Sequence, residues 1–514
     1  MAIELVREAF KVEELKGNNE IQALVETEIY LSPTKPNIEK ILWVHGKVNV
    51  LNTKLIKDKL IVSGVTRFDV LYNSVDEENN SSIQTLETSK EFREELDIDG
   101  ADEDMVAKVK SKIEYLEYEI EESKVQLKAL VNLWGEVEEY KNIEAIKQIK
   151  GNDSLQTLKE TVNYKEVFGR EISYAMVNDV IKLGDNYPEI DEIVKFSTKT
   201  REVESMVVED RIITSGEIMA NIIYFGQNKV HSYKTTIPFN HFLEMPGVNK
   251  NLMGNVEYEV VEGNYEIMGN ELGERKLIDL EIKVKVTGKA FQDNTRELII
   301  DAYSTKEKLS IEREEVNIRE SLKDLKQIED LKIALDVDAD DILEVEGYVG
   351  ILDKRVIDMG IEVEGVLSLD IEYIDRVTED IMSSKEDVPF KVNIYDDLDP
   401  ESIVDVVPSI DNIDYSLSRD GLEVDCKVLL NANLSKNRRI YGIKEVIETN
   451  ETIDKKNKPS ITVYIVQKGD VLWDIAKRYN TTTEDIIVSN NITNGVINPG
   501  DKIIIEKKIE EMKV

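Results

Sequence analysis

The stretch DKLIVSGVTRFDVLY, residues 58–72, returns later in the chain as DRIITSGEIMANIIY, residues 210–224. The glycines of the two stretches lie 152 positions apart, and so do their final tyrosines. A third stretch, DMGIEVEGVLSLDIEY at residues 358–373, keeps the eight-residue step from glycine to tyrosine. Similarity at a fixed period is the sequence signature of a repeat architecture. The sequence therefore predicts three related units of one fold.

A second motif supports the same period. KPNIEKIL at residues 35–42 matches YPEIDEIV at residues 187–194, and the two prolines are again 152 positions apart. The third copy has ADADDILEV at this place and lacks the proline. We therefore divide the body of the chain into three repeats, which cover residues 1–150, 151–303 and 304–445.

The repeats are rich in valine and isoleucine that alternate with polar residues. Residues 277–286, LIDLEIKVKV, and residues 422–430, LEVDCKVLL, show the pattern clearly. A two-residue period with β-branched side chains is typical of half-buried antiparallel strands. The predicted fold class is mainly β, built from tandem antiparallel β-rich repeats.

Three segments suggest helix within this β pattern. Apolar residues between Val106 and Ile120 fit a heptad, but the counterpart in the second copy, residues 255–268, reads as strand. Because repeats share structure, we expect a strand from about Ile113 with a short helix before it. The acidic segments 136–149 and 320–331 are expected to form helical connectors between the repeats.

The C-terminal stretch VYIVQKGDVLWDIAKRYNTTTEDIIVSNNITNGVINPGDKIIIE, residues 463–506, has a different pattern. It predicts a strand, two helices and a returning strand, with glycine turns between them. The whole stretch resembles the LysM family, a small βααβ fold that binds sugars, and we assign the module to residues 462–507. A polar linker at residues 446–461 is expected to leave the module free to change orientation.

Composition limits the functions that the chain can have. It contains 104 acidic residues against 65 basic ones, a formal net charge of −39. Such a field repels nucleic acid and anionic lipid surfaces. The charged start, MAIELVREAF, predicts no signal peptide, and a single cysteine allows no internal disulfide. We therefore expect a protein without membrane insertion that stays in the cytoplasm, although non-classical release stays open.

No set of residues predicts catalysis. The three histidines, His45, His231 and His241, are scattered, and Cys426 lies within an apolar strand pattern. The aspartates of residues 336–341 suggest a calcium loop, but the sixth position lacks the glycine that such a loop requires. We therefore predict no enzyme activity, no metal site and no cofactor.

The module contains the candidate binding residues. Leu472 and Trp473 are neighbours on the first helix, so an inward Leu472 leaves Trp473 toward the surface, where it can anchor a sugar or a protein. Position 471 is valine, and the missing hydroxyl favours an apolar, protein-type contact over N-acetylglucosamine. The predicted site consists of two loops, the tryptophan and the approach to the first strand: Gly469, Asp470, Val471, Leu472, Trp473, Asn491, Ile492, Thr493 and Ile461.

The body of the chain resembles the SPOCS family of spore-coat-associated proteins. The resemblance is carried by MAIELVRE at the start, by KPNIEKIL, by the repeated stretch at residues 58–72 and by FLEMPG before paired strands. It implies a non-enzymatic scaffold of the mother-cell cytoplasm that gathers on the forespore surface. There the LysM module would bind a coat morphogenetic ATPase (SpoIVA-like) and other coat proteins. The alternative function is a module that binds peptidoglycan through its N-acetylglucosamine glycan.

Overall fold

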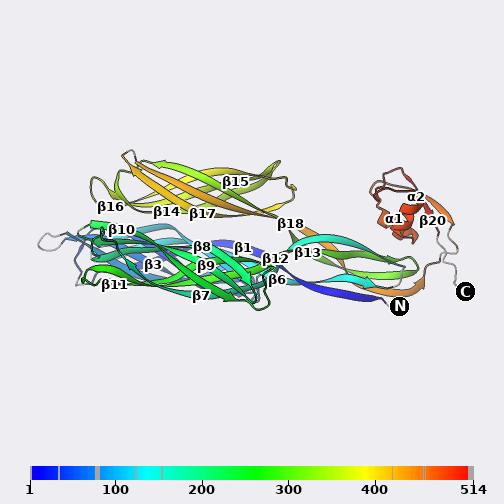
Figure 1. Cartoon of the computed structure of the whole chain (residues 1–514), viewed down its shortest axis with the longest axis horizontal. Helices are drawn as coiled ribbons and strands as arrows, with labels where there is room; N and C mark the ends of the chain where they lie inside the picture. Colours follow the sequence, from blue (N-terminus) through cyan, green and yellow to red (C-terminus); the bar gives the residue numbers. More distant parts are fainter. Residues whose placement is uncertain are drawn as a thin grey trace.

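The computed structural model describes residues 3–32, 35–75, 81–121, 124–151, 154–227, 229–419, 421–454, 457 and 459–507. Their strands form three sets of six with the same order and pairing, followed by a small module with two helices (Figure 1). The predicted mainly β fold is confirmed, and the sheets are antiparallel throughout the three sets.

The first two sets have the following strands. The first set comprises β1 (Glu4–Tyr30), β2 (Ile38–Ile56), β3 (Lys59–Val75), β4 (Ser81–Asp97), β5 (Val106–Glu121) and β6 (Lys124–Lys150). The second comprises β7 (Leu155–Lys182), β8 (Glu192–Val208), β9 (Arg211–Gly226), β10 (Lys229–Glu244), β11 (Met253–Gly269) and β12 (Arg275–Ser304).

The third set and the module complete the chain. The third set comprises β13 (Glu307–Leu335), β14 (Ala339–Ile357), β15 (Gly360–Asp375), β16 (Ile381–Tyr395), β17 (Ile403–Ser418) and β18 (Gly421–Thr452). The module comprises β19 (Ile461–Ile465), α1 (Leu472–Tyr479), α2 (Thr483–Asn490) and β20 (Lys502–Glu506).

Each set forms a head with three strands in each of two layers, and a pairing of β1 with β7 at Val12 and Glu166 joins the first layers of the first two sets into one six-stranded sheet. In the first set β1 pairs with β6 and β6 with β5, while β2, β3 and β4 form the second sheet. The same connections recur with β7–β12 and with β13–β18. Apolar side chains from the two sheets of each set make one buried cluster, because alternate residues of every strand face the other sheet.

The repeated sequence stretch has a packing role in every head. It forms the middle strand of the second sheet, where Gly64 and Gly216 lie opposite Phe92 and Phe239 on the neighbouring strand. An added Cβ at Gly64 would lie 2.4 Å from the Phe92 ring, so the ring fills the space above the glycine. This cross-strand pairing explains why glycine recurs in strands that otherwise favour β-branched residues.

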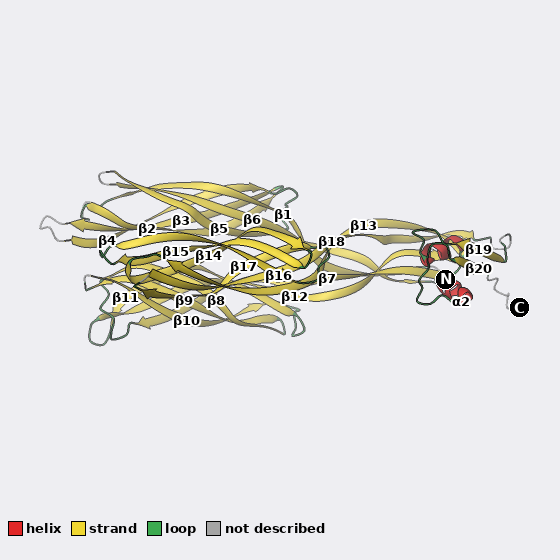
Figure 2. Ribbon diagram, turned by 90° about the horizontal axis from the view of Figure 1, so that it is seen from above, coloured by secondary structure: helices red, strands yellow, loops and turns green. Residues whose placement is uncertain are grey.

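The ends of the long strand pairs leave the heads and run together as a stalk. We define the stalk as residues 4–14 with 139–150, 155–166 with 292–304, and 307–320 with 436–452. Its three strand pairs, which we number in this order, share two apolar clusters, and every pair contributes to both of them. Figures 1 and 2 show the stalk projecting from one end of the heads.

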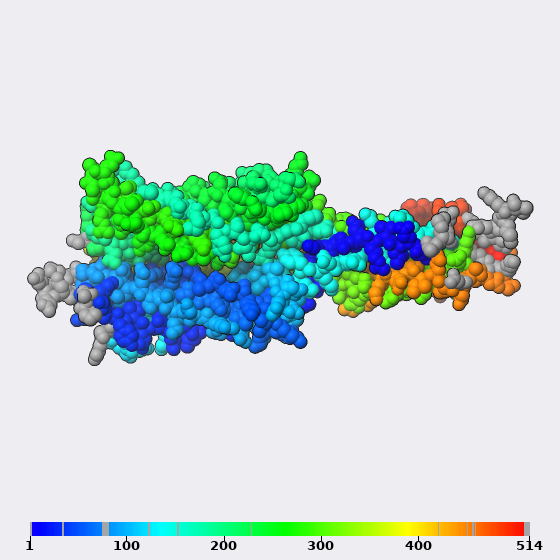
Figure 3. Space-filling model, turned by 90° about the horizontal axis from the view of Figure 1, so that it is seen from below, coloured from blue at the N-terminus to red at the C-terminus, as the bar shows by residue number. Residues whose placement is uncertain are grey.

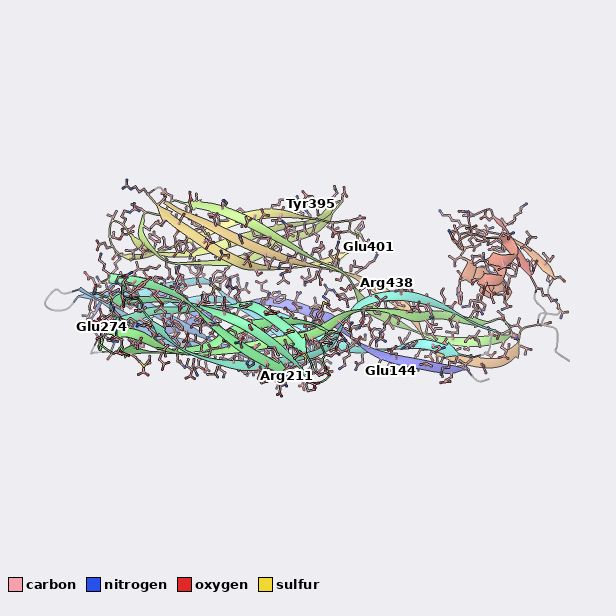
Figure 4. The ribbon with its side chains drawn as sticks, in the orientation of Figure 1. Glu144, Arg211, Glu274, Tyr395, Glu401 and Arg438 are labelled. Atoms are coloured by element: carbon pink, nitrogen blue, oxygen red, sulfur yellow. The ribbon has the colours of Figure 1, made fainter. Side chains whose placement is uncertain are left out.

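Polar contacts also join the strand pairs where they enter the stalk. Arg438 of β18, labelled at this junction in Figure 4, forms ion pairs with Glu160 of β7 and Glu320 of β13. Its guanidinium also donates to the Thr161 carbonyl at 3.0 Å. One arginine therefore links the second strand pair to the third.

The expected helical connectors are wrong. Residues 136–149 lie in β6 and residues 320–331 lie in β13, the two strand types that build the stalk. Ile143, Ile146 and Ile149 are buried at a three-residue spacing that resembles a helical face. A register shift between Val6 and Arg7 of the partner strand interrupts the usual two-residue period. Tertiary pairing therefore overrides the helix propensity of these Glu- and Lys-rich segments.

The short helix expected before Ile113 is also wrong, whereas the strand itself is confirmed. β5 begins at Val106 and pairs with β6 from its first residue. Val109, Ile113 and Leu116 of the apparent heptad pack against the core of the first head. The similarity to the second repeat predicted the structure better than the local spacing did.

The three heads meet at equivalent positions. Figure 3 shows the first and second heads side by side, and Figure 1 shows the third head beside them. Trp43, Lys195 and Glu344 each follow a register shift at the same place in β2, β8 and β14. All three lie at the contact between heads, so one structural position carries an aromatic, a cation and an anion in the three repeats.

Lys195 is the centre of this contact. Its Nζ lies 2.7 Å from Glu344 and 2.8 Å from Glu372 of the third head, and 5.0 Å from the centre of the Trp43 ring of the first head. Its side chain is only 5% exposed. The buried ammonium therefore joins two heads by charge and a third through an aromatic face.

This contact predicts a pH-dependent stability. Burial, reinforced by Glu344 and opposed by Lys195, raises the pKa of Glu372 from 4.5 to about 7. Between these values the folded state binds more protons than the unfolded state, so stability falls as the pH rises from 4.5 to 7. Glu372→Gln should match the wild type at pH 5 and exceed its unfolding free energy at pH 8 by at most roughly 3 kcal/mol.

Urea denaturation of both proteins at the two pH values measures this difference. Burial raises the pKa of the nearby Asp69 to about 6 and lowers that of His45 to about 3. Comparison with the variant cancels these other groups, because both proteins contain them. Equal differences at pH 5 and pH 8 would contradict the assigned pKa of Glu372.

Candidate functional site

The module is a two-stranded sheet covered by two helices. Val466, Ile475 and Ile503 are buried at its centre, because α1 and α2 place their apolar residues against one side of β19 and β20. The second helix begins after Thr482, whose hydroxyl accepts a hydrogen bond from the Asp485 amide at 3.0 Å. The module therefore has its own core and its own helix cap.

The first predicted loop is a rigid turn. Gly469 has a φ of +92°, a conformation that glycine adopts without strain. The Asp470 carboxylate accepts hydrogen bonds from the Tyr464 hydroxyl at 2.6 Å and from the Gln467 amide at 2.8 Å. Val471 is exposed, whereas Leu472 is buried in the module core. The structure thus gives Asp470 and Leu472 structural contacts and leaves Val471 accessible.

The other predicted residues lie on two parts of the module surface. Asn491 ends α2 in a left-handed conformation and is exposed, as is Thr493, while Ile492 packs partly against the core. Ile461 is 60% exposed at the start of β19, opposite Glu506. These side chains are available to a ligand or partner, apart from the packed part of Ile492.

Trp473 contacts the body of the protein. Its indole Nε1 donates to Asp301 of β12 at 2.8 Å, and Lys477, one turn later on α1, donates to the same carboxylate at 2.6 and 2.7 Å. Arg313 of β13 also forms an ion pair with Asp301. Burial opposes ionisation of Asp301, but the hydrogen bonds from Lys477 and Trp473 outweigh it and hold its pKa below the usual value.

Tyr303 completes this contact. Its ring meets Trp473 edge-on with 4.8 Å between the ring centres, and its hydroxyl donates to the Thr481 carbonyl at 2.8 Å. Only 5% of Tyr303 is exposed, and it belongs to the apolar cluster of the module. The module is therefore docked on the stalk through one carboxylate and one aromatic ring. Figures 1 and 2 show the module at the end of the stalk that lies away from the heads.

The docked module differs from the expectation of a freely oriented one. The segment between β18 and β19, residues 453–460, is polar as the sequence indicated, but contacts outside it fix the module. Sequence reasoning missed Asp301 and Tyr303, because nothing in the module's own pattern identifies the surface that covers it. An aromatic residue at the end of a stalk strand in one repeat alone was the available signal.

A second exposed surface lies on the module sheet. Ile461, Val463 and Ile465 of β19 are 60%, 60% and 52% exposed, and Ile504 of β20, opposite Val463, is 39% exposed. We call these four residues the sheet face. The helices cover the other side of the sheet, so the sheet face is an apolar surface that the described stalk contacts leave open.

Other kinds of site receive no support from the described residues. Within them, no three His, Cys, Asp or Glu side chains are grouped to hold a metal ion. Cys426 is buried in the third head, and burial raises the pKa of its thiol to about 11. Neither helix of the described chain is long and apolar enough to cross a membrane.

Comparison with known families assigns both parts of the chain. The SipL SPOCS domain matches residues 37–121, 189–268 and 338–418, one region in each head, and the LysM domain matches residues 464–506. Comparison with curated proteins and with solved structures gave no match. These two domain types indicate a sporulation-related protein. With three SPOCS domains followed by one LysM domain, the chain belongs to the SipL-type proteins.

Proposed function

We propose that the chain is a non-enzymatic scaffold of endospore coat assembly. Its LysM domain binds a coat morphogenetic ATPase (SpoIVA-like) at the forespore surface, and its three SPOCS heads provide the rigid body that other coat proteins contact. The proposal rests on the family match together with the contacts of the module surface formed by Trp473 and Lys477 of α1, which we call the Trp473 surface.

The observation that carries the proposal is what Trp473 contacts. Its partners are the carboxylate of Asp301 and the ring of Tyr303, both of them protein groups. A surface that fits protein side chains within the chain is suited to protein side chains of a partner. Val471, two residues before Trp473, is exposed and offers no hydroxyl to a sugar.

Binding of peptidoglycan is the second candidate function. The LysM match favours it, and Asn491 and Thr493 are exposed with polar groups that a glycan can use. Sedimentation of the full chain with purified peptidoglycan separates the two functions. The scaffold function predicts that little protein sediments, whereas saturable sedimentation would support the glycan function.

Trp473→Glu should weaken the binding of coat proteins roughly tenfold, a loss of about 1.4 kcal/mol of binding free energy, and so lower their recovery from sporulating cells. A carboxylate at this position removes the aromatic anchor and the indole donor. Affinity capture with the tagged full chain, followed by mass spectrometry, measures the recovery.

Val488→Glu is the matched control. Val488 lies on α2, is 69% exposed and belongs to no contact described above, so the same charge is added elsewhere on the module. This variant should recover coat proteins as the wild type does. Unchanged recovery with Trp473→Glu would contradict the proposed function.

A further inference from the structure

The stalk segment that holds the module offers two groups on one side of a strand. Asp301 and Tyr303 are two positions apart on β12, so their side chains point the same way. The carboxylate accepts from Trp473 and Lys477, and the phenol packs on the indole and donates to the Thr481 carbonyl. The module surface is thus complementary to a carboxylate followed two residues later by an aromatic ring.

Comparison with the other two strand pairs of the stalk shows how this segment differs from its equivalents. Each strand pair has a register shift near its end, between Val6 and Arg7, between Ile299 and Asp301, and between Glu312 and Arg313. Buried pairs on either side of the shift match as well, namely Ile146 and Ile149, Ile299 and Ala302, and Ile443 and Val446. These matches fix which residues occupy equivalent positions.

The equivalents of Asp301 and Tyr303 do not form an acidic and aromatic pair. The first strand pair has Gln148 and Lys150 at these positions, and the third has Glu445 and Ile447. Lys150 is exposed and Ile447 is 51% exposed, whereas Tyr303 is 5% exposed. The position therefore faces outward from the stalk, and Tyr303 is covered because the module lies on it.

The contact is small enough to be exchanged. It consists of one carboxylate, one ring and one hydroxyl, and Lys477 at its edge is 36% exposed. The tether of residues 453–460 keeps the stalk segment near the module, so an external partner must add contacts of its own. The sheet face provides such contacts, since the stalk does not use it.

From these observations, and resting on the proposed function, we propose that the Trp473 surface recognises an acidic and aromatic strand segment of its protein partner. The segment carries Asp or Glu followed two positions later by Tyr or another aromatic residue. Asp301 and Tyr303 are an internal copy of this ligand. They occupy the surface in the free chain, and the partner segment displaces them.

The test uses the full chain with the stalk ligand removed. Asp301→Gln with Tyr303→Lys gives the second strand pair the residues of the first, so the stalk should fold normally. Unchanged thermal unfolding of the heads verifies this. The probe is a fluorescent peptide with the sequence of residues 297–305, ELIIDAYST. Fluorescence anisotropy measures its binding to the double variant and to the wild type.

The double variant should bind this peptide saturably. A peptide with Asn in place of Asp and Leu in place of Tyr should bind roughly tenfold more weakly, and the wild type should bind the first peptide roughly tenfold more weakly than the double variant does. Adding Trp473→Glu to the double variant should abolish the preference between peptides.

Two results would overturn the inference. One is a double variant that binds both peptides equally, and the other is a wild type that binds as tightly as the double variant. If coat proteins are still captured in a Trp473-dependent manner in those cases, the proposed function stands and only the ligand chemistry is wrong. Selective peptide binding without capture of coat proteins would instead leave the ligand chemistry in place and contradict the proposed function.

Discussion

Lys195→Met should lower the free energy of unfolding by about 3–5 kcal/mol, the range for a buried ion pair that loses one partner. The substitution leaves the carboxylates of Glu344 and Glu372 buried beside one another at the contact between heads. It also removes the cation from the face of Trp43. Urea denaturation at pH 7, followed by circular dichroism of the strands, measures the loss.

A compensated variant separates lost charge from lost packing. Lys195→Met combined with Glu344→Leu and Glu372→Leu removes all three charges and replaces them with apolar side chains. This triple variant should regain most of the lost stability, since well-packed apolar groups often replace buried ion pairs without cost. A single variant as stable as the wild type would contradict the role of Lys195 in joining the heads.

Gly365→Ala should destabilise the protein by about 1–3 kcal/mol, the cost of overpacking a strand pair. The added Cβ would lie 2.4 Å from the Phe390 ring and 2.7 Å from the Gly350 carbonyl oxygen. The ring can turn aside, but the carbonyl is held by the strand pairing, so the strain cannot be relieved fully. Thermal and urea unfolding measure the change.

Gly442→Ala is the control for this prediction. Gly442 also lies within a strand, but the nearest atom to its added Cβ is Val316 Cγ2 at 4.0 Å. The control should change stability by only a few tenths of a kcal/mol or increase it, because alanine restricts the unfolded chain more than glycine does. Equal losses in the two variants would show that the Phe390 contact is unimportant.

The repeats could be predicted from the sequence because their recurring residues make the same packing and hydrogen-bond contacts in the different copies. The prolines and tyrosines that were matched at 152 positions form one interaction: the Tyr72 hydroxyl donates to the Pro36 carbonyl at 3.3 Å, and the Tyr224 hydroxyl to the Pro188 carbonyl at 3.4 Å. The glycines of the same stretch hold an aromatic ring across the sheet. Local packing of this kind leaves a clear sequence pattern.

The helical connectors and the docking surface could not be predicted in the same way. Glu144, labelled in Figure 4, and its neighbours in β6 have helix-forming composition. Pairing with β1 and packing of the three strand pairs of the stalk nevertheless determine their structure. The helical position of Trp473 indicates only that it faces away from the module core. That Asp301 covers it depends on a contact 172 residues away in the sequence.

The central claim is that the LysM domain binds protein. Site-specific photo-crosslinking from Ile461 in sporulating cells tests it most directly, because this residue is 60% exposed and lies outside the stalk contact. A photoreactive residue placed there should crosslink to coat proteins, the coat ATPase among them, while one placed at Val488 should not. Crosslinks from Ile461 to peptidoglycan fragments, or a pattern identical to that from Val488, would contradict the claim.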